Sequence, residues 1–367
     1  MNLDIDLFID HLKENNIIVS NGNYYKYNEY NRLCRIYNVD IQFLYCEFTK
    51  NTHVHNFNFL EKYIFSKMTD FSIDNNPGLL GFDNGVYDFK TNNFRKYKKE
   101  DLMSISVGYN YHEFGNEDQS ILDLETLLSD IFPNDAEKNY FLKYLSVTLN
   151  KNFKNNNIFV NYSEKNKGKS TMFKLIRDSF GQYHKLYPNI SIFSENDASY
   201  FDDLRLITYD ACDKCQININ SYKLLAKVNI LIGSNNLNNF EIKCDIPNTI
   251  KILEYEGNFK SDENVILNIS SYKVQFMHLL LNKYYKMYLS DGLIVPIKVL
   301  SKTQDFYNFH SLNQQLILFL RKYHYHIDSS NTEIYYLYRT HCIENNILSM
   351  QYKDFTNQIN KIKKLFR

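Results

Sequence analysis

Several residue types are absent or scarce in this chain of 367 residues. It has no tryptophan, only 5 prolines and 11 glycines, and no net charge, because 42 basic residues balance 42 acidic ones. This balance excludes a protein that binds nucleic acid through positive charge spread over its whole surface, so any such contact must come from local patches. No signal peptide opens the chain, and no apolar run approaches membrane-spanning length. The sequence therefore predicts a soluble intracellular protein with no membrane partner, and leaves cytoplasm and nucleus open.

The 6 cysteines are scattered without a framework, which indicates a reducing compartment rather than a disulfide-stabilised fold. Cys212 and Cys215 form a lone C-x-x-C pair, and no second pair follows at the spacing of a zinc site. A metal or redox role for this pair is therefore the less favoured interpretation. The length of 367 residues allows two or three domains with separate cores.

Tyrosine and phenylalanine are abundant, with 31 and 27 residues. Asn, Lys, Ile, Tyr and Phe all have AT-rich codons. The abundance of these residues therefore indicates an AT-rich genome more than a particular fold. Residues 7–12 predict a short helix, and residues 17–19 and 24–37 predict strands joined by Asn-Gly turns. Tyrosines as dense as those of residues 24–37 can stack on bases, but half-buried strand positions are their commoner role.

Residues 157–180 have the pattern of a phosphate-binding loop. Their sequence, NIFVNYSEKNKGKSTMFKLIRDSF, predicts a buried strand, a polar loop ending in Gly168 and Lys169, and an amphipathic helix that Gly181 ends. In such a loop the backbone N–H groups and the lysine bind phosphate, and the Ser170 hydroxyl binds Mg²⁺. The first glycine of the pattern is replaced by Ser163, and a short GKST occurs by chance in lysine-rich proteins, so an ordinary strand-to-helix turn is the alternative.

The surrounding segments predict alternating strands and helices. Two strands flank Asn84-Gly85, a turn covers residues 91–93, and another strand precedes Lys98; helices follow over residues 120–132 and, with Asp135 as N-cap, 135–149. An apolar strand over residues 204–209 ends in Asp210, which is a candidate for the carboxylate that binds Mg²⁺ beside a phosphate loop, with an ordinary turn residue as the alternative. A helix over residues 222–232 and a third strand over residues 249–253 complete this part.

The last sixty residues or so predict three short helices, marked by apolar residues at 312–323, 334–341 and 355–362. This pattern is typical of a helix-turn-helix or winged-helix module. The final helix carries four lysines that form a candidate nucleic-acid contact, with a solvated basic face as the alternative. They are Lys353, Lys361, Lys363 and Lys364.

Several segments together resemble the superfamily 3 helicase region of poxvirus-type primase–helicases and their relatives in large DNA viruses, phages and plasmids. They are residues 81–91 (GFDNGVYDFKT), followed by YNY at 109–111; residues 141–145 (FLKYL); residues 168–171 (GKST); and residues 232–235 (IGSN), where the family has a Gly-Gly-Asp turn. No single segment is specific, but their order and spacing match the family over most of the chain from about residue 78 onward.

This resemblance implies an α/β fold with three parts. They are an N-terminal α+β accessory domain of the primase–helicase linker type (1–118), an AAA+-like P-loop ATPase domain of the superfamily 3 helicase type (119–303) and a winged-helix-like DNA-binding module (304–367). By resemblance the chain is an ATP-dependent DNA helicase that forms a homo-oligomer, a hexamer, around single-stranded or forked DNA. A separate primase or polymerase is a further implied partner.

The resemblance also implies the site. Lys169 and Asp210, in the Walker A and Walker B positions, would carry catalysis on ATP. Ser163, Gly168, Ser170 and Thr171 would complete the nucleotide contacts, and Ser170 and Asp210 would hold Mg²⁺. The family ends its third strand in a polar sensor, usually Asn. Here Asn258, slightly displaced, is the residue that could serve.

The departures from the family concern catalysis. Lys167 stands where the family usually has Asn, and no arginine lies between Arg205 and Arg321, where the family has its arginine finger. Such a finger is worth roughly 10³ to 10⁵ in hydrolysis rate, and Lys273 lacks the planar fork to replace it. An active replicative helicase and a catalytically degenerate paralogue that binds nucleic acid or a replication partner both stay open. A small P-loop kinase is disfavoured because no arginines cluster for a second phosphate-bearing substrate.

Overall fold

The structure, a computed structural model, falls into two compact units, residues Met1–Pro296 and Ile297–Arg367. It describes residues 2–51, 56–115, 117–153, 157–163, 166–187, 201–211, 215–218, 228–237, 240–243, 250–257, 267–322, 330–345 and 348–365. Within these ranges no helix has both the length and the apolar character needed to cross a membrane. The three-part division expected from the sequence stays a prediction.

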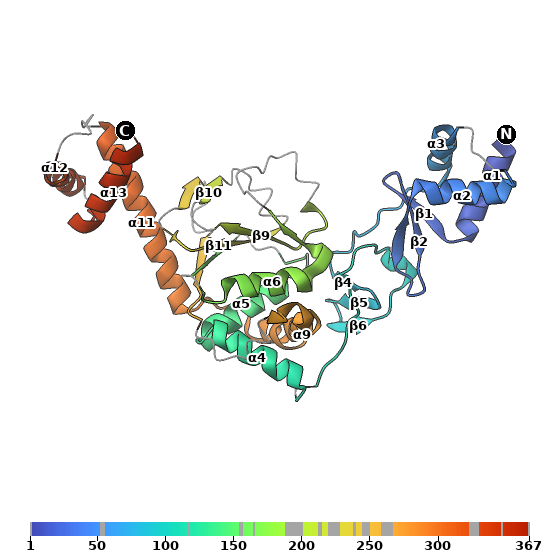
Figure 1. Cartoon of the computed structure of the whole chain (residues 1–367), viewed down its shortest axis with the longest axis horizontal. Helices are drawn as coiled ribbons and strands as arrows, with labels where there is room; N and C mark the ends of the chain where they lie inside the picture. The colour runs from blue at the N-terminus through green and yellow to red at the C-terminus, as the bar shows by residue number, and fades with distance from the viewer. Residues whose placement is uncertain are drawn as a thin grey trace. The chain divides into compact units, whose positions relative to one another are not determined.

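The described helices and strands of the first unit follow one another in groups along the chain (Figure 1). The α-helices are α1 (Asn2–Glu14), α2 (Asn38–Thr49), α3 (Phe57–Lys67), α4 (Gln119–Ile131), α5 (Asp135–Thr148), α6 (Lys169–Phe180), α9 (Lys273–Leu279) and α10 (Tyr285–Asp291). Three short 3-10 helices are η1 (Lys99–Asp101), η2 (Gly181–Tyr183) and η6 (Ile269–Tyr272), and η7 (Leu280–Tyr284) is a π-helix between α9 and α10. The strands are β1 (Ile17–Ser20), β2 (Asn23–Tyr27), β3 (Leu33–Ile36), β4 (Leu79–Phe82), β5 (Gly85–Asp88), β6 (Asn93–Arg95), β7 (Ile158–Tyr162), β8 (His184–Leu186), β9 (Leu206–Ala211), β10 (Cys215–Asn218), β11 (Asn229–Ser234), β12 (Phe240–Lys243) and β13 (Ile250–Glu254).

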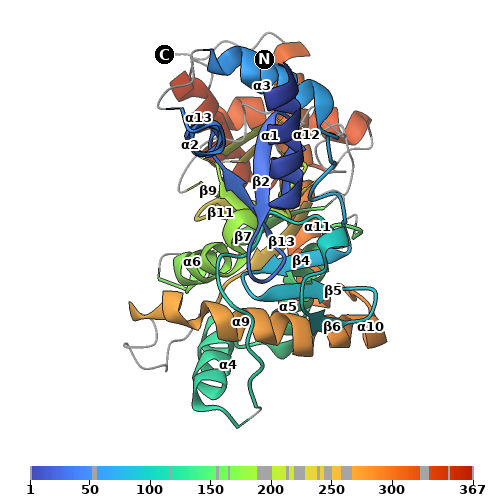
Figure 2. The same ribbon diagram turned by 90° about the vertical axis from the view of Figure 1, so that its right-hand side faces the viewer.

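A five-stranded parallel sheet forms the centre of this unit, in the order β13-β7-β11-β9-β8. Strand β7 lies between β13 and β11, so that Ile158 pairs with both Ile250 and Ile230. Helices α4, α5, α6 and α9 lie on the same side of the sheet in both views (Figures 1 and 2). Burial of nearly every residue of β7 and β11 explains their continuous apolar sequences.

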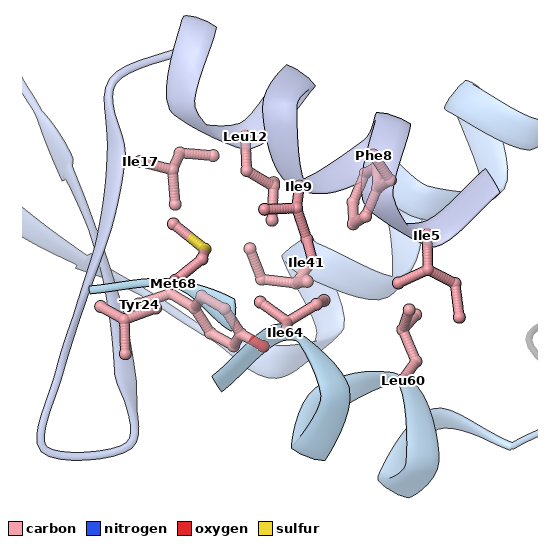
Figure 3. Close-up of a cluster of buried hydrophobic side chains, with 11 residues drawn as sticks. Ile5, Phe8, Ile9, Leu12, Ile17, Tyr24, Ile41, Leu60, Ile64 and Met68 are labelled. Atoms are coloured by element: carbon pink, nitrogen blue, oxygen red, sulfur yellow. The ribbon is translucent and has the colours of Figure 1, made fainter. Parts of the chain in front are cut away.

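The N-terminal part of the unit is a small two-layer arrangement. Strands β1, β2 and β3 form an antiparallel sheet, and the turn between β1 and β2 uses Asn21 and Gly22 with φ of 47° and 69°. Side chains from α1, α2 and α3 pack on one face of this sheet around Ile17 and Tyr24 (Figure 3). The other face of the sheet is not covered by these helices. The strands predicted from the tyrosine-rich stretch are therefore confirmed.

Residues 81–91, the segment that resembles the helicase family, lie within the antiparallel hairpin of strands β4, β5 and β6. The Asn84 side chain accepts a hydrogen bond from the Tyr111 N–H (2.8 Å) and donates one to the Tyr111 carbonyl (3.0 Å), so its amide acts as one residue of strand pairing. Tyr111 in turn stacks on Phe94 with ring centroids 4.5 Å apart. These contacts hold the hairpin against the segment that follows it.

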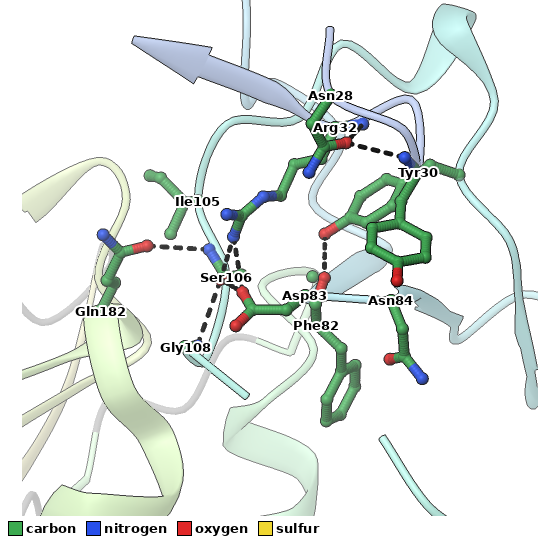
Figure 4. A network of polar contacts seen from close by, with 12 residues as sticks. Asn28, Tyr30, Arg32, Phe82, Asp83, Asn84, Ile105, Ser106, Gly108 and Gln182 are labelled. Atoms are coloured by element: carbon green, nitrogen blue, oxygen red, sulfur yellow. Dashed lines mark hydrogen bonds and ion pairs between the residues drawn. The ribbon is translucent and has the colours of Figure 1, made fainter. Parts of the chain in front are cut away.

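The segment that follows the hairpin holds the far end of α6. The Tyr183 hydroxyl accepts a hydrogen bond from Gly81 (2.9 Å) and donates one to the Ile105 carbonyl (3.0 Å). Ser106 donates its N–H to Gln182 (2.9 Å) and its hydroxyl to Asp83 (2.7 Å). Arg32, from the N-terminal part, donates to both Asp83 and Ser106 (Figure 4). A continuous polar network therefore runs from the N-terminal part to the end of α6.

The second unit consists of the helices α11 (Ile297–Lys322), α12 (Asn331–Glu344) and α13 (Tyr352–Leu365) in its described ranges. Their shared core includes Leu316, Tyr338 and Phe355. Three helices are thus confirmed, but the first, α11, is 26 residues long and begins at Ile297, well before the residues that predicted a short helix. Helix α12 begins with a capping box, in which Ser330 accepts from the Glu333 N–H and the Glu333 carboxylate accepts from the Ser330 N–H.

Two local predictions are wrong. Residues 229–232 are not the end of a helix but part of β11, because an apolar run this short suits either structure and its place between β7 and β9 makes it a strand. Residues 222–227 lie outside the described residues. The N-cap of α5 is Asn134, whose side chain accepts from the Ala136 N–H, and Asp135 is the first helical residue.

Candidate nucleotide site

The candidate phosphate loop connects the carboxyl end of β7 to α6. Gly168 is the N-cap of α6 with φ of 88°, and Asn166 also has a left-handed φ of 62°. Ser163 is buried, and its N–H donates to the Ser234 carbonyl (3.1 Å), which continues the strand pairing beyond β7. Because Ser163 does not have a positive φ, the backbone at this position does not need glycine.

Lys169 lies at the first position of α6 and is 5% exposed. Its ammonium group donates a hydrogen bond of 2.6 Å to the Asn235 side-chain oxygen. Asn235 directly follows β11, the neighbour of β7 in the sheet, so the carboxyl ends of two adjacent parallel strands bring these side chains together. The first N–H groups of a helix have no partner within the helix, and they make this end attractive to an anion.

Asp210 lies on β9, one strand further along the sheet, opposite Gly233 of β11. A Cβ atom on Gly233 would lie 2.6 Å from the Asp210 carboxylate and 3.3 Å from the Phe173 ring of α6. Glycine at position 233 therefore leaves room for the Asp210 side chain on the side of the sheet that α6 covers. Asp210 itself is exposed.

The chain after β13 also contacts the loop. A Cβ atom on Gly257 would lie 2.5 Å from the Lys167 carbonyl oxygen, so the two backbones are in direct contact. The Lys167 ammonium group donates to the Gly257 carbonyl at 3.5 Å. Asn161, near the end of β7, is fully buried, and neither polar atom of its side chain has a hydrogen-bond partner among the described residues. These contacts fix the loop from the side of β13.

The amino ends of the same strands have a different environment. Arg205, immediately before β9, is 5% exposed, donates to the Leu79 carbonyl (3.1 Å) and lies over the Tyr183 ring (5.3 Å). Burial lowers the pKa of its guanidinium group, and its Nε and Nη1 atoms have no hydrogen-bond partner among the described residues. Nearby, burial and the charge of Arg177 lower the pKa of His184 to about 4.

The predicted site residues fall into three groups. Lys169, Gly168, Ser170, Thr171 and Ser163 lie together around the start of α6, with Ser170 exposed. Asp210 lies two strands away on the same side of the sheet. Asn258 is outside the described residues, as are the side chains of Lys361, Lys363 and Lys364, whereas Lys353 is exposed on α13.

Sequence reasoning missed Asn235 and Gly233 as site residues. Both lie in the IGSN segment, which was matched to a turn, whereas Gly233 and Ser234 are strand residues of β11. The strand that carries the residue contacting Lys169 is β11, and β13 lies on the opposite side of β7. The sequence signal for these residues is the apolar run of residues 230–232, which two asparagines at 235–236 follow. This pattern is typical of the end of a strand as much as of the end of a helix.

The residues present suit a magnesium–nucleotide complex better than a metal ion alone. In the part of the chain that the structure describes, no three His, Cys, Asp or Glu side chains are grouped to hold a metal. Magnesium commonly takes one or two carboxylates together with phosphate oxygens of a substrate. The Asp210 carboxylate and the Ser170 hydroxyl have the chemistry for this role, and Lys169 has the charge for the phosphates.

Comparison with known proteins bears on the helicase resemblance found in the sequence. Residues 49–133 match the D5 N-terminal-like family model. The chain is 28% identical over 114 residues to the "Putative helicase" of Acanthamoeba polyphaga mimivirus and 29% identical over 135 residues to that of Invertebrate iridescent virus 3. These alignments cover 31% and 36% of this chain but only 12% and 14% of the relatives. The predicted resemblance is confirmed: over these segments the chain is similar to viral proteins described as putative helicases.

Among solved structures, the chain is similar to two apo structures of the NrS-1 C-terminal region. The TM-scores are 0.49 and 0.48, with sequence identities of 11% and 13%. The similarity covers 85% and 87% of this chain and 78% and 80% of those chains.

Proposed function

We propose that this chain is a viral replication protein of the helicase type that binds ATP with Mg²⁺ at the start of α6 and binds DNA. The observation that carries the proposal is the 2.6 Å contact between Lys169 and Asn235. It places a buried ammonium group at a helix N-terminus, beside the amide of Asn235, which follows β11. Strand β11 pairs with β9, which carries Asp210. A phosphate group that enters here is bound by the Lys169 ammonium group and the N–H groups of the helix.

Within this proposal, Lys169 binds the β- and γ-phosphates, and the α6 N–H groups bind the oxygens next to them. Ser170 and Asp210 hold Mg²⁺, and Asn235 takes the sensor role that the sequence had assigned to Asn258. The winged-helix-like unit contacts single-stranded or forked DNA through Lys353 and the lysines near the C-terminus. A hexameric homo-oligomer and a separate primase or polymerase are the partners that the resemblance supports.

A second candidate is a catalytically degenerate paralogue that binds nucleotide and nucleic acid but hydrolyses ATP slowly. The sequence between Arg205 and Arg321 favours it, because it contains no arginine. This region of a neighbouring copy therefore cannot supply an arginine finger. Arg205 itself is buried at the opposite end of the sheet, against Tyr183 and Leu79.

One experiment separates the two candidates. ATP turnover is measured with and without single-stranded DNA, beside the affinity for a non-hydrolysable ATP analogue, in the wild-type chain and in Lys169→Ala and Asn235→Ala. Binding that both variants weaken supports the nucleotide site. DNA-stimulated turnover supports the active helicase, binding without turnover supports the degenerate paralogue, and an absence of binding rejects both.

A further inference from the structure

The tyrosine-rich strands present two chemically different faces. Side chains alternate along β2 and β3, so Tyr24 enters the core against the helices, whereas Tyr25 and Tyr27 lie on the opposite face. Tyr25 is paired across the strands with Arg35, which is exposed. Tyr25 and Tyr27 are half-buried, and Leu33, on the same face, is buried. The next residue on that face is Tyr37, which is 64% exposed.

Two of these rings are accompanied by a cation. The Arg35 guanidinium lies 5.7 Å from the centre of the Tyr37 ring, and the Lys99 ammonium lies 5.5 Å from that of Tyr27. The Tyr27 hydroxyl also donates to the Lys99 carbonyl (3.2 Å), which fixes this ring beside η1. Tyr27 and Tyr37 belong to opposite ends of the paired strands, on the order of 13 Å apart at the usual rise per residue.

The segment that brings Lys99 beside Tyr27 is rich in basic residues. Residues 90–101 contain five of them, Lys90, Arg95, Lys96, Lys98 and Lys99, against Glu100 and Asp101. Arg95 is paired with Asp101 at 2.8 Å and with Asp88 at 3.2 Å. Asp74, near Tyr25, has its carboxylate occupied by the N–H groups of Ser104 (2.7 Å) and Ile105 (3.2 Å).

We propose that the open part of the β1–β2–β3 face opposite helices α1, α2 and α3, defined by Tyr25, Tyr27, Arg35, Tyr37 and Lys99, binds single-stranded nucleic acid. Exposed aromatic rings stack on unpaired bases, and basic side chains beside them contact the backbone phosphates. The cation at each ring orients its face before binding and adds attraction for the phosphates. This inference rests on the proposed function, because it names a surface with which a helicase-type protein would contact single-stranded nucleic acid.

The test uses the full-length chain without nucleotide. Its affinity for fluorescein-labelled single-stranded oligonucleotides, one of deoxythymidine and one of uridine, is measured by fluorescence anisotropy at several salt concentrations. Tyr37→Ala and Tyr27→Ala are each expected to weaken binding roughly 5- to 100-fold, whereas Tyr37→Phe and Tyr27→Phe retain it, because the ring stacks without its hydroxyl. Arg35→Ala is expected to reduce the salt slope by roughly 0.7.

The chain offers a matched control on the other layer. Lys67 lies 5.6 Å from the centre of the Tyr63 ring on α3, so Lys67→Ala and Tyr63→Ala remove the same chemistry from the helical side. The control variants are expected to bind as the wild type does. Thermal unfolding of each variant, within a few degrees of the wild type, establishes that lost binding is not lost folding. Equal affinities for the sheet and control variants would overturn the proposal, and so would a wild-type chain that binds neither oligonucleotide.

Crosslinking distinguishes this surface from the rest of the proposed function. An oligonucleotide with 5-bromodeoxyuridine is irradiated on the chain, and attachment within residues 23–37 is expected. Attachment only to the second unit, near Lys353, would overturn this proposal while leaving DNA binding in place. Attachment to residues 23–37 in a chain that binds no ATP would support it while the nucleotide site fails. Unchanged DNA binding in the tyrosine variants, with altered sedimentation of the chain alone, would mark the face as a contact between copies and overturn it.

Discussion

The central sheet holds one buried cation at each end, and the two have opposite surroundings. Lys169 at the carboxyl end and Arg205 at the amino end are both 5% exposed. Lys169 contacts the neutral amide of Asn235 at a helix N-terminus, whereas Arg205 is held by the Leu79 carbonyl and the Tyr183 ring from distant segments. The first arrangement suits an exchangeable anion. The second joins parts of the chain.

The largest expected effect tests the carboxyl end. Lys169→Met is expected to lower the affinity for a non-hydrolysable ATP analogue roughly 100-fold, because a charged contact to phosphate is lost from a buried position. Titration calorimetry measures the affinity, and thermal unfolding shows that the variant is folded at the temperature of the assay. Lys174→Met, on the same helix, is the control, and equal affinities for the two variants would contradict the assignment.

The amino end is expected to respond in the reverse way. Arg205→Met loses its hydrogen bond to Leu79 and its contact with the Tyr183 ring, which lowers the unfolding free energy by about 2–4 kcal/mol. The affinity for nucleotide below the unfolding temperature is expected to stay within a few-fold of the wild type. Chemical denaturation is the measurement, and Arg177→Met is the control, because its side chain is 50% exposed. If Arg205→Met lost nucleotide affinity without losing stability, the amino end of the sheet, and not the carboxyl end, would be the nucleotide site.

A smaller effect tests whether Asp210 belongs to the magnesium site. In Gly233→Ala the new Cβ atom, 2.6 Å from the carboxylate oxygen, displaces the Asp210 side chain. We expect nucleotide binding in the presence of Mg²⁺ to weaken about tenfold, with little change when the metal is chelated. Gly115→Ala serves as the control, because nothing lies within 4 Å of a Cβ atom there. An unchanged magnesium dependence would exclude Asp210 from the metal site.

The smallest effect concerns His184, whose Nε2 lies 2.7 Å from the Thr208 hydroxyl near the amino end of the sheet. Its pKa of about 4 in the folded chain is below the unfolded value, so the unfolded chain binds more protons between about pH 4 and 6.5. Stability that is present above the unfolded pKa is therefore lost as the pH falls. We expect a loss of about 1 kcal/mol between pH 7 and 5 that His184→Gln abolishes. Denaturation midpoints at both pH values check this, and parallel curves would contradict it.

Local patterns explain what the sequence could predict. The β7–loop–α6 unit is continuous in the chain, and each of its parts has its own signal, from the apolar run to Gly168 and Gly181. The strands around Asn84 and the three C-terminal helices were predictable for the same reason. Their hydrogen bonds or apolar contacts depend on residues a few positions apart.

The remaining features depend on topology. Asn235 contacts Lys169 because β11 inserts between β7 and β9, and no local pattern specifies this order of strands. Arg205 depends on Tyr183 and Leu79, which reach it from separate segments. The alternation of Tyr24 and Tyr25 between two faces was visible in the sequence, but the helices that cover only one of these faces were not.

The joint around Tyr183 also governs when the sheet can be completed during synthesis. The bond from Gly81 to Tyr183 spans 102 residues, and that from Arg205 to Leu79 spans 126. At the usual rates of translation, the hairpin segment waits roughly 5 to 25 seconds for these partners to be made. The amino end of the sheet therefore closes late, through contacts of high sequence separation that slow folding. A fragment that begins after this segment would keep the candidate phosphate loop but lack the residues that close the sheet beneath it.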